Sequence, residues 1–415
     1  MAHTGLRLTG AVDAADQATL RHSPDPSRRV AAPVVLHVRV VANAGGGPDK
    51  TILRGPGYVD PMRYHLAAAY IHPEGQDGIA VLRDRARAWG CPFYEIAEQG
   101  AFDPHTVRHL LALCRKLRVT IWHGHDYKSN ALGLLLRRFW PMVLVTTAHG
   151  WTWDTWRMRL YHHVDNFCLG RYDHVIVVSP LILEHCRHLG IDEQRLSHIP
   201  NGIEPADYVR QHSRPQARNL LDIGQDRLIL GVVGRLSPEK GVDRAIRALT
   251  HLRKIYPQAE MHLVGDGPES ARLQQLAQSR GVGDAVHFHG WQKDPRNFFE
   301  AMDVLLLPSL TEGLPNVVLE AMALGVPVAA TDVGGVPELL DGGRCGTILD
   351  QDYHSWTAHL SPLLVSPERR EELARRAQLR VHERYSFAQR MEREVAVYDR
   401  LLRVEAAPRP LRRAA

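Results

Sequence analysis

Cysteine is scarce in this sequence, and long apolar runs are missing. Five cysteines occur in 415 residues, at scattered positions without CxxC spacing, which argues against a disulfide framework or a zinc cluster and favours a reducing compartment. No segment approaches the roughly 18 consecutive apolar residues of a transmembrane helix. Residues 1–29 lack the apolar core of a secretory signal, and we expect them to form a disordered lead-in. These absences together predict a cytoplasmic protein.

Basic and acidic residues nearly balance, so the formal net charge is only +5. The excess of positive charge is concentrated in residues 101–160, which hold nine basic residues and three acidic ones. Such a patch can attract an anionic membrane surface, nucleic acid or a phosphorylated substrate. No basic motif interleaved with aromatic residues supports nucleic acid. A peripheral contact with the inner face of the plasma membrane and a solvated helix face over a core-facing apolar stripe explain the pattern equally well. The basic residues are Arg108, Arg115, Lys116, Arg118, Arg137 and Arg138, and they flank Leu110, Leu111, Leu134, Leu135, Leu136 and Phe139.

The composition is that of an ordinary globular protein, with 44% apolar and 23% charged residues, and the chain is too long for one compact core. Strand-like runs such as Val34–Val41, Ile79–Leu82 and Leu228–Val233 alternate with helical stretches in both halves. This alternation predicts an α/β protein with two doubly wound parallel sheets facing a cleft. A polar stretch over 205–225 is expected to link the two domains, which we place at 30–205 and 206–385.

The most informative segment runs from Thr311 to Met322 and reads TEGLPNVVLEAM. A buried strand should end before it, and a helix should begin near Pro315, so that the unpaired N–H groups of its first turn form an anion site that needs no metal. Glu320 lies about one turn beyond Asn316 and could accept hydrogen bonds from a vicinal diol. Glu312, in the turn, could accept hydroxyl hydrogens from a sugar. The alternative is a pair of surface glutamates on an ordinary helix.

Two further segments carry groups that suit a diphosphate. Arg235 and Lys240 follow the strand-like run 228–233, and a guanidinium with an ammonium can neutralise a departing diphosphate; a surface basic pair is the alternative. The loop Gly45–Gly47 lacks P-loop spacing, because Ala44 and Asp49 stand where glycine is needed. It still allows close approach of backbone N–H groups to a ligand, although a plain tight turn fits nearly as well.

Histidines follow the strand-like runs of the first half. The stretch His123-Gly124-His125-Asp126 does not match the spacing of a metal-dependent hydrolase, so no metal site is expected there. The D-x-D at 350–352 follows no strong strand and is interpreted as a solvated loop. His125 and Asp126 should reach the acceptor side of the cleft, and His149 should act as a neutral hydrogen-bonding group beside a sugar. The alternative for His149 is a histidine at a strand end whose hydrogen bonds are all made within the protein.

These motifs in combination resemble the retaining GT-B glycosyltransferases of family 4, over about residues 34–403. The motifs are GGG (45–47), AHGW (148–151), VVSP (177–180), IPNGI (199–203), VGRLSPEKG (233–241), VGDGPE (264–269), HFHGW (287–291) and the long segment 308–339. The resemblance implies metal-free transfer of a sugar, with retention, from a nucleotide diphosphate donor to a saccharide or lipid-linked acceptor. It also implies a last helix, at about 386–403, that crosses back onto the first domain.

The same resemblance implies roles for single residues. Arg235 and Lys240 would hold the diphosphate, Glu312 and His149 would contact the sugar, and Glu320 would bind the ribose. The remaining donor-binding positions would be Gly46, Gly47, Gly234, Gly265, Asp266, Gly290, Trp291, Gly313, Leu314, Pro315 and Asn316. The expected setting is the synthesis of an exopolysaccharide or a cell-surface glycan. A same-fold epimerase or phosphorylase and a catalytically silent nucleotide-sugar-binding module remain as alternatives.

Overall fold

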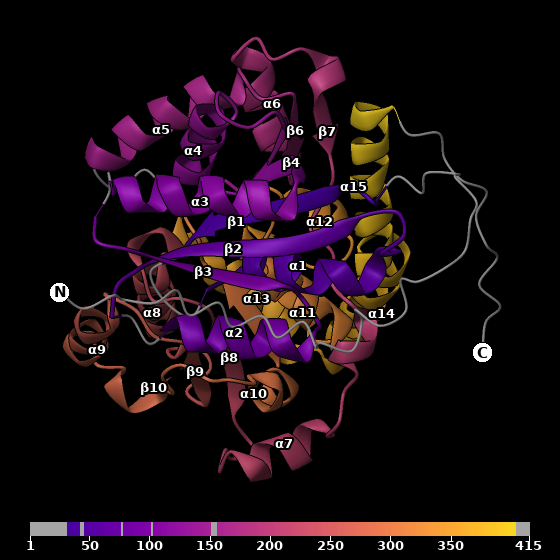
Figure 1. Ribbon diagram of the computed structural model, residues 1–415. Coiled ribbons are helices and arrows are strands. Elements are labelled where there is room, and N and C mark those ends of the chain that lie inside the picture. Colours follow the sequence, from indigo (N-terminus) through magenta and orange to yellow (C-terminus); the bar gives the residue numbers. More distant parts are fainter. Residues whose placement is uncertain (1–30, 42–44, 76–77, 101–102, 151–155, 404–415) are drawn as a thin grey trace.

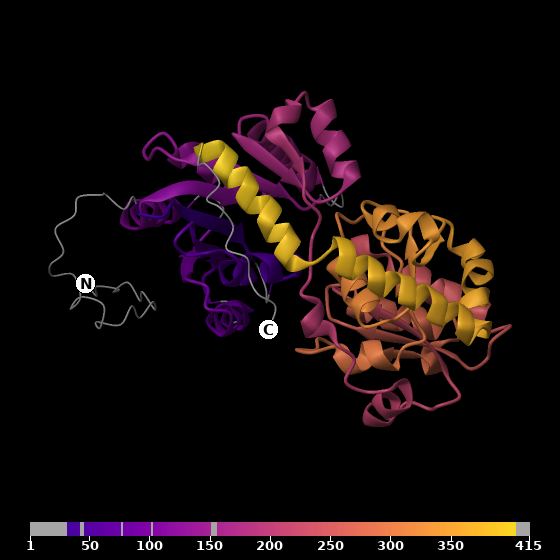
Figure 2. The same ribbon diagram turned by 90° about the vertical axis from the view of Figure 1, so that its right-hand side faces the viewer.

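The computed structural model describes residues 31–41, 45–75, 78–100, 103–150 and 156–403, so the expected lead-in at 1–29 lies outside it. The described chain forms two parallel sheets in two lobes (Figures 1 and 2). This arrangement confirms the predicted α/β class.

The first sheet has the strand order β3-β2-β1-β4-β5-β6-β7, and every neighbouring pair is parallel. Its strands are β1 (Val34–Val40), β2 (His65–Pro73), β3 (Phe93–Glu98), β4 (Val119–Gly124), β5 (Val143–Ala148), β6 (His174–Val177) and β7 (Leu196–His198). Helices of this half are α1 (Gly47–Arg54), α2 (Gly78–Ala88), α3 (Pro104–Leu117), α4 (Tyr127–Leu136), α5 (Trp156–Leu169) and α6 (Pro180–His188).

The second sheet has the order β10-β9-β8-β11-β12-β13 and is also parallel. Its strands are β8 (Leu228–Val233), β9 (Ala259–Val264), β10 (Val286–Phe288), β11 (Val304–Leu307), β12 (Val328–Thr331) and β13 (Thr347–Leu349). The accompanying helices are α7 (Arg214–Leu220), α8 (Val242–Leu252), α9 (Ser270–Ser279), α10 (Arg296–Ala301), α11 (Asn316–Ala323), α12 (Val336–Leu339), α13 (Trp356–Val365) and α14 (Pro367–Arg384).

One expected strand is a helix. Residues Ile79–Leu82 lie inside α2, where Ile79 and Leu82 are buried on one face. A short apolar run does not distinguish a buried strand from the buried face of a helix, and here the spacing of three residues between the two buried side chains suits the helix.

The last helix, α15 (Phe387–Leu402), leaves the second lobe and packs on the first sheet (Figure 2). Its side chains Phe387, Met391, Val395 and Tyr398 share an apolar cluster with residues of β1, β4, β5 and β6. The first and last described elements, β1 and α15, therefore lie in the same lobe, and α15 connects the two lobes.

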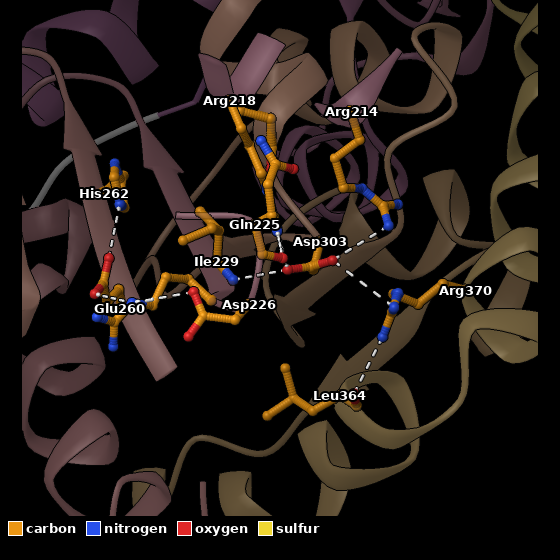
Figure 3. Close-up of polar contacts among 12 residues, drawn as sticks. Arg214, Arg218, Gln225, Asp226, Ile229, Glu260, His262, Asp303, Leu364 and Arg370 are labelled. Atoms are coloured by element: carbon orange, nitrogen blue, oxygen red, sulfur yellow. Dashed lines mark hydrogen bonds and ion pairs between the residues drawn. The ribbon is translucent and has the colours of Figure 1, made fainter. Parts of the chain in front are cut away.

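A buried carboxylate organises the edge of the second sheet where its strands begin. Asp303, directly before β11, accepts hydrogen bonds from Arg218 Nη2 at 2.7 Å and from the Ile229 backbone N–H at 2.8 Å (Figure 3). Arg214 and Arg370 lie 3.3 and 3.8 Å from its other oxygen. Asp303 thereby joins α7, β8 and α14 at the sheet edge opposite the carboxyl ends of the strands.

None of the described helices combines the length and the apolar character that crossing a membrane requires.

Candidate functional site

The two lobes meet where the carboxyl ends of their strands face each other. Gly313, in the turn before α11, lies so close to His149 at the end of β5 that a Cβ on Gly313 would stand 1.9 Å from the His149 carbonyl oxygen. Across the same contact, Asn201 Nδ2 donates to the Leu314 carbonyl at 2.9 Å. The EGLP turn of the second lobe is therefore seated against the strand ends of the first.

Glu312 and Lys240 form an ion pair at this contact. Lys240 Nζ lies 2.7 Å from Glu312 Oε1, and Ser309 Oγ donates to the same oxygen at 2.6 Å. The Glu312 side chain is 8% exposed, whereas that of Lys240 is 29% exposed. The cation predicted for a diphosphate and the carboxylate predicted for a sugar are thus adjacent, and the cation is the more accessible of the two.

A second ion pair bridges the lobes. Glu320, on α11, accepts from Lys50 Nζ of α1 at 2.6 Å, and Lys50 also lies 3.4 Å from the Tyr208 hydroxyl. Burial disfavours the Lys50 ammonium, but Glu320 and Tyr208 together outweigh burial and raise the pKa of Lys50. The sequence argument places Glu320 at the site but not Lys50, which follows a glycine loop that lacks P-loop spacing.

The glycine loop of the first lobe faces the start of α11. Asn316 Nδ2 donates to the Gly47 carbonyl at 3.0 Å, and a Cβ on Gly47 would lie 2.9 Å from that amide nitrogen. The Gly46 N–H is bonded to the Asp49 carboxylate, whose other oxygen lies 2.9 Å from Arg39 Nε. Asp49 therefore fixes the loop at the distance that the contact with Asn316 requires.

The start of α11 carries no side-chain cap. Pro315 is its N-cap residue, in an extended conformation, and makes no capping hydrogen bond through its side chain. The Val318 N–H donates to the Pro315 carbonyl at 3.1 Å, and no side chain of the described residues caps the N–H groups of Asn316 and Val317, the positions that the sequence argument assigned to an anion site.

The remaining predicted donor residues lie at the ends of β8, β9 and β10. Arg235 is exposed, directly after β8 and Gly234. Gly265 and Gly290 pair through a hydrogen bond from Gly265 N–H to the Gly290 carbonyl at 2.8 Å. Asp266 is exposed, and its Oδ1 accepts from the Gly267 N–H at 2.7 Å; Trp291 is 54% exposed. These groups form one open edge of the second sheet.

A cavity of about 520 Å³ lies between the lobes beside Glu320. Lys50, Tyr208, Asn316 and Glu320 line part of it, and Arg296 and Phe299 line another part. The cavity is therefore bounded by both domains and by the segment that links them.

Four histidines form a stacked column from the core of the first lobe to the cleft. Hydrogen bonds join His37 Nδ1 to His125 Nε2 at 3.0 Å and His125 Nδ1 to His149 Nε2 at 3.1 Å. His123 lies beside both His37 and His125, at 4.7 Å and 4.6 Å between ring centroids. Burial lowers the pKa of His123, His125 and His149 well below the usual value, so these rings are neutral.

Nitrogen atoms of His37, His123 and His125 lie close enough together to suggest a metal site. Their rings are stacked, with angles of 11° to 27° between the planes. An imidazole binds a metal in the plane of its ring, so three nearly parallel rings do not direct their lone pairs at one point. Glu260, His262 and His287 form a second group, but Arg227 lies 3.3 Å from Glu260 and opposes a cation there.

Asp126 serves a local purpose in this structure. Its carboxylate caps α4 by accepting from the backbone N–H groups of Lys128 and Ser129, and it accepts from the Val40 N–H at 2.8 Å. The carboxylate is half-buried and ties β1 to the start of α4. His125, by contrast, lies in the histidine column and contacts His149, so of the two predicted acceptor-side residues only His125 touches another predicted site residue among the described contacts.

The column has a sequence signal that the motif search passed over. Residues two apart on a strand share a face, and Val35 with His37, Ile121 with His123 and His125, and Val145 with Thr147 and His149 follow this period. Each strand is apolar first and polar near its carboxyl end. The pattern indicates a sheet face whose far end is built for hydrogen bonding.

Comparisons with known proteins agree with this geometry. Residues 37–207 match the family model described as Glycosyltransferase Family 4, and residues 213–380 match Glycosyl transferases group 1. A GDP-mannose-dependent alpha-(1-6)-phosphatidylinositol monomannoside mannosyltransferase of Mycolicibacterium smegmatis is 32% identical over 265 residues, which cover 60% of this chain and 68% of that relative. A D-inositol 3-phosphate glycosyltransferase of Gordonia bronchialis is 30% identical over 316 residues, covering 69% and 67%.

Solved structures share the fold. HepE of Anabaena in complex with UDP-glucose superposes with a TM-score of 0.76 at 20% identity, covering 88% of this chain and 98% of that one. Sucrose-phosphate synthase of Thermosynechococcus elongatus gives a TM-score of 0.74 at 20% identity, with coverages of 90% and 100%. Two parallel-sheet lobes, a shared cleft and both family matches lead to one conclusion: the chain belongs to the GT-B glycosyltransferases of the family 4 type.

Proposed function

We propose that this glycosyltransferase moves a sugar from a nucleoside-diphosphate-sugar donor to a saccharide or lipid-linked saccharide acceptor, with retention and without a metal ion. The observation that carries the proposal is the Lys240–Glu312 pair in the turn before α11. It sets a cation suited to a diphosphate beside a carboxylate suited to sugar hydroxyls, at the contact between the lobes.

The residues divide the donor between them. Arg235, Lys240 and the open start of α11 would hold the diphosphate, while Glu312 and the backbone of 313–316 would hold the sugar. Glu320 would accept the ribose hydroxyls, and its pair with Lys50 would hold the carboxylate in place for them. The glycine loop at 46–47 would approach the diphosphate from the first lobe, and the nucleoside base would lie at the edge that includes Gly265 and Trp291.

Transfer would follow a front-face substitution. The bond between the anomeric carbon and the diphosphate breaks, the diphosphate leaves with the electron pair, and the acceptor hydroxyl attacks on the same face and releases its proton toward the leaving phosphate. The enzyme contributes positioned charge and no covalent nucleophile. A positively charged contact to the leaving group typically contributes ~3 kcal/mol to lowering the barrier.

The test begins with a donor screen. UDP-, GDP- and ADP-sugars are compared for their effect on the melting temperature, with GDP-mannose included because the Mycolicibacterium relative is described as GDP-mannose-dependent. The stabilising donor is then assayed for transfer in EDTA, and the anomeric configuration of the product is read by NMR. Activity that strictly requires added magnesium, or an inverted product, would contradict the proposal.

A lysine exchange tests the diphosphate site. Lys240→Ala should lower transfer by about a hundredfold, the effect of losing one stabilising contact to the leaving group, while circular dichroism shows that the protein stays folded. Lys254→Ala, an exposed position after α8, is the matched control and should keep full activity. Near-normal turnover of Lys240→Ala would overturn the assignment. Formation of a sugar phosphate after inorganic phosphate is added would favour a phosphorylase. Binding of the donor without turnover would favour a catalytically silent binding module.

The proposal extends to an anionic membrane surface that would present a lipid-linked acceptor. Of the apolar residues considered for it, Leu110 and Leu136 are fully buried and belong to the core, whereas Leu135 and Phe139 are exposed. Phe167, on α5, is 55% exposed. Arg137, Arg138 and Arg171 line a shallow pocket together with Leu134 and Phe167, so that cations and exposed apolar side chains occupy one surface.

Vesicle sedimentation tests this surface. At low salt the protein should co-sediment with vesicles containing anionic phosphatidylglycerol and not with neutral ones. Arg138→Glu should weaken that binding several-fold, whereas Arg280→Glu, exposed after α9, should not. Absence of co-sedimentation of the wild-type protein would remove the membrane from the proposal.

A further inference from the structure

The histidine column begins at a buried carboxylate that the proposed transfer does not use. Glu394 on α15 is 2% exposed; it is paired with Arg390 one turn away and accepts a hydrogen bond from the Tyr398 hydroxyl at 2.8 Å. Its Oε1 lies 3.9 Å from His37 Nε2 and 3.9 Å from His123 Nδ1. The carboxylate of the crossover helix therefore faces two histidines of the first sheet.

Glu394 carries a negative charge. Burial alone would raise the pKa of this carboxyl group, but the positive charge of the paired Arg390 holds it below its usual value. A lone pair on His37 Nε2 would point at that charge, whereas an N–H there is attracted to it. The carboxylate thus favours the tautomer of His37 with hydrogen on Nε2 and a bare Nδ1.

The preference passes along the column, because each neutral imidazole has one donor and one acceptor nitrogen. If His37 Nδ1 is bare, it accepts from His125 Nε2–H at 3.0 Å, which leaves His125 Nδ1 bare. His125 Nδ1 then accepts from His149 Nε2–H at 3.1 Å, which leaves His149 Nδ1 bare. That last nitrogen is buried and has no hydrogen-bond partner among the described residues.

A second set of hydrogen bonds, through Tyr398 and His123, is consistent with this direction of donation. The Tyr398 hydroxyl donates to Glu394, so it accepts from His123 Nδ1–H at 2.7 Å. His123 Nε2 is then bare and accepts from the Thr147 hydroxyl at 2.8 Å. Both sets of hydrogen bonds leave Glu394 as the acceptor, and neither requires a charged imidazole.

We propose that Glu394 is a positioning residue, which acts through His37 and His125 to hold His149 with hydrogen on Nε2 and a bare Nδ1 that accepts a hydrogen bond from a ligand hydroxyl. This inference rests on the proposed function only in taking that hydroxyl to be a sugar's. It gives the crossover helix a chemical connection to the cleft in addition to its packing on the first sheet.

Nitrogen NMR measures the tautomer directly, without substrate. The full-length protein labelled with ¹⁵N-histidine is examined at pH 7.5 by long-range ¹H–¹⁵N correlation, and His149→Gln assigns the signals of His149. The wild-type protein should show His149 protonated on Nε2 and bare on Nδ1. A proton on Nδ1, or an imidazolium, would overturn the proposal.

Two variants test the source of the preference. Glu394→Gln places an amide donor toward His37 and should reverse the column, so that His149 carries its hydrogen on Nδ1. His37→Phe keeps the stacked ring, removes both nitrogens, and should leave His149 as a mixture of tautomers even if Glu394→Gln fails to fold. His174→Asn, a buried histidine bonded to Ser197 outside the column, should leave the His149 signals unchanged. An unchanged His149 in both column variants would contradict the role of Glu394.

Activity separates this inference from the proposed function. Both column variants should lower kcat/KM by about tenfold, the effect of one lost hydrogen bond in the transition state, while His174→Asn does not. A reversed tautomer with normal transfer would overturn the hydroxyl contact. Failure of the wild-type protein to transfer any sugar would instead overturn the proposed function, and the tautomer measurement would still decide the role of Glu394.

Discussion

At the scale of single residues, the cleft depends on contacts that leave no room for a methyl group. A Cβ on Gly313 would stand 1.9 Å from the His149 carbonyl, so Gly313→Ala should push the two lobes apart at the sugar turn. A displacement of about 1 Å can lower turnover by about a hundredfold. We expect a loss of that size in a transfer assay. Gly57→Ala, where a Cβ would meet nothing within 4 Å, should be active, and full activity of Gly313→Ala would contradict this contact.

Glu320 offers a second residue-scale prediction. Glu320→Ala removes the proposed ribose acceptor and leaves Lys50 without the carboxylate that raises its pKa. Donor binding should weaken by at least about tenfold, which is the loss of about 1.4 kcal/mol. Calorimetric titration of the donor measures this. The exposed Glu371→Ala on α14 is the control, and equal donor affinity in the two variants would remove Glu320 from the site.

At the scale of secondary-structure elements, the second lobe depends on Asp303. Asp303→Ala leaves Arg218 buried without its carboxylate, and breaking such a pair costs about 3–5 kcal/mol. Urea unfolding followed by circular dichroism should show a lower midpoint for the second lobe. Asp226→Ala, whose side chain is 80% exposed, should leave the midpoint unchanged. Equal midpoints for the two variants would mean that the cluster in Figure 3 contributes little.

Elements with regular patterns were predictable from the sequence, and others were not. The bounds of β8 agree with the run Leu228–Val233, β1 ends one residue before the run Val34–Val41 does, and α11 begins directly after Pro315, where the sequence predicts a helix start. The sequence pattern does not predict β2, because its centre is Ala67–Ala69 and alanine has a low preference for strands. The pair Lys50–Glu320 was not predictable, since it joins residues 270 positions apart and depends on how the lobes dock.

At the scale of the whole molecule, buried neutral histidines make stability depend on pH. Burial lowers the pKa of His37 and of His174 to about 4 from 6.5, so the unfolded chain binds protons that the folded chain does not. The free energy of unfolding should be highest above pH 6.5 and should fall as the pH drops toward 4. At pH 5 the loss is about 2 kcal/mol per histidine. The pKa of Glu394 is about 2, so its contribution is lost only below this range.

Urea midpoints at pH 7.5 and pH 5 measure this dependence. The wild-type protein should be less stable at pH 5, and His37→Asn should reduce the difference between the two midpoints. His188→Asn, whose side chain is 74% exposed, should show the wild-type difference. Equal stability of the wild-type protein at both pH values would show that the column is not neutral in the folded state.

The central claim is that the two lobes hold the diphosphate of a nucleotide at the turn before α11. A crystal structure of the protein soaked with GDP, or with UDP if that is the nucleotide it binds, tests this most directly. The account predicts phosphate oxygens in contact with Lys240 and Arg235 and ribose hydroxyls at Glu320. Phosphates bound elsewhere, with the Lys240–Glu312 turn unoccupied, would contradict it.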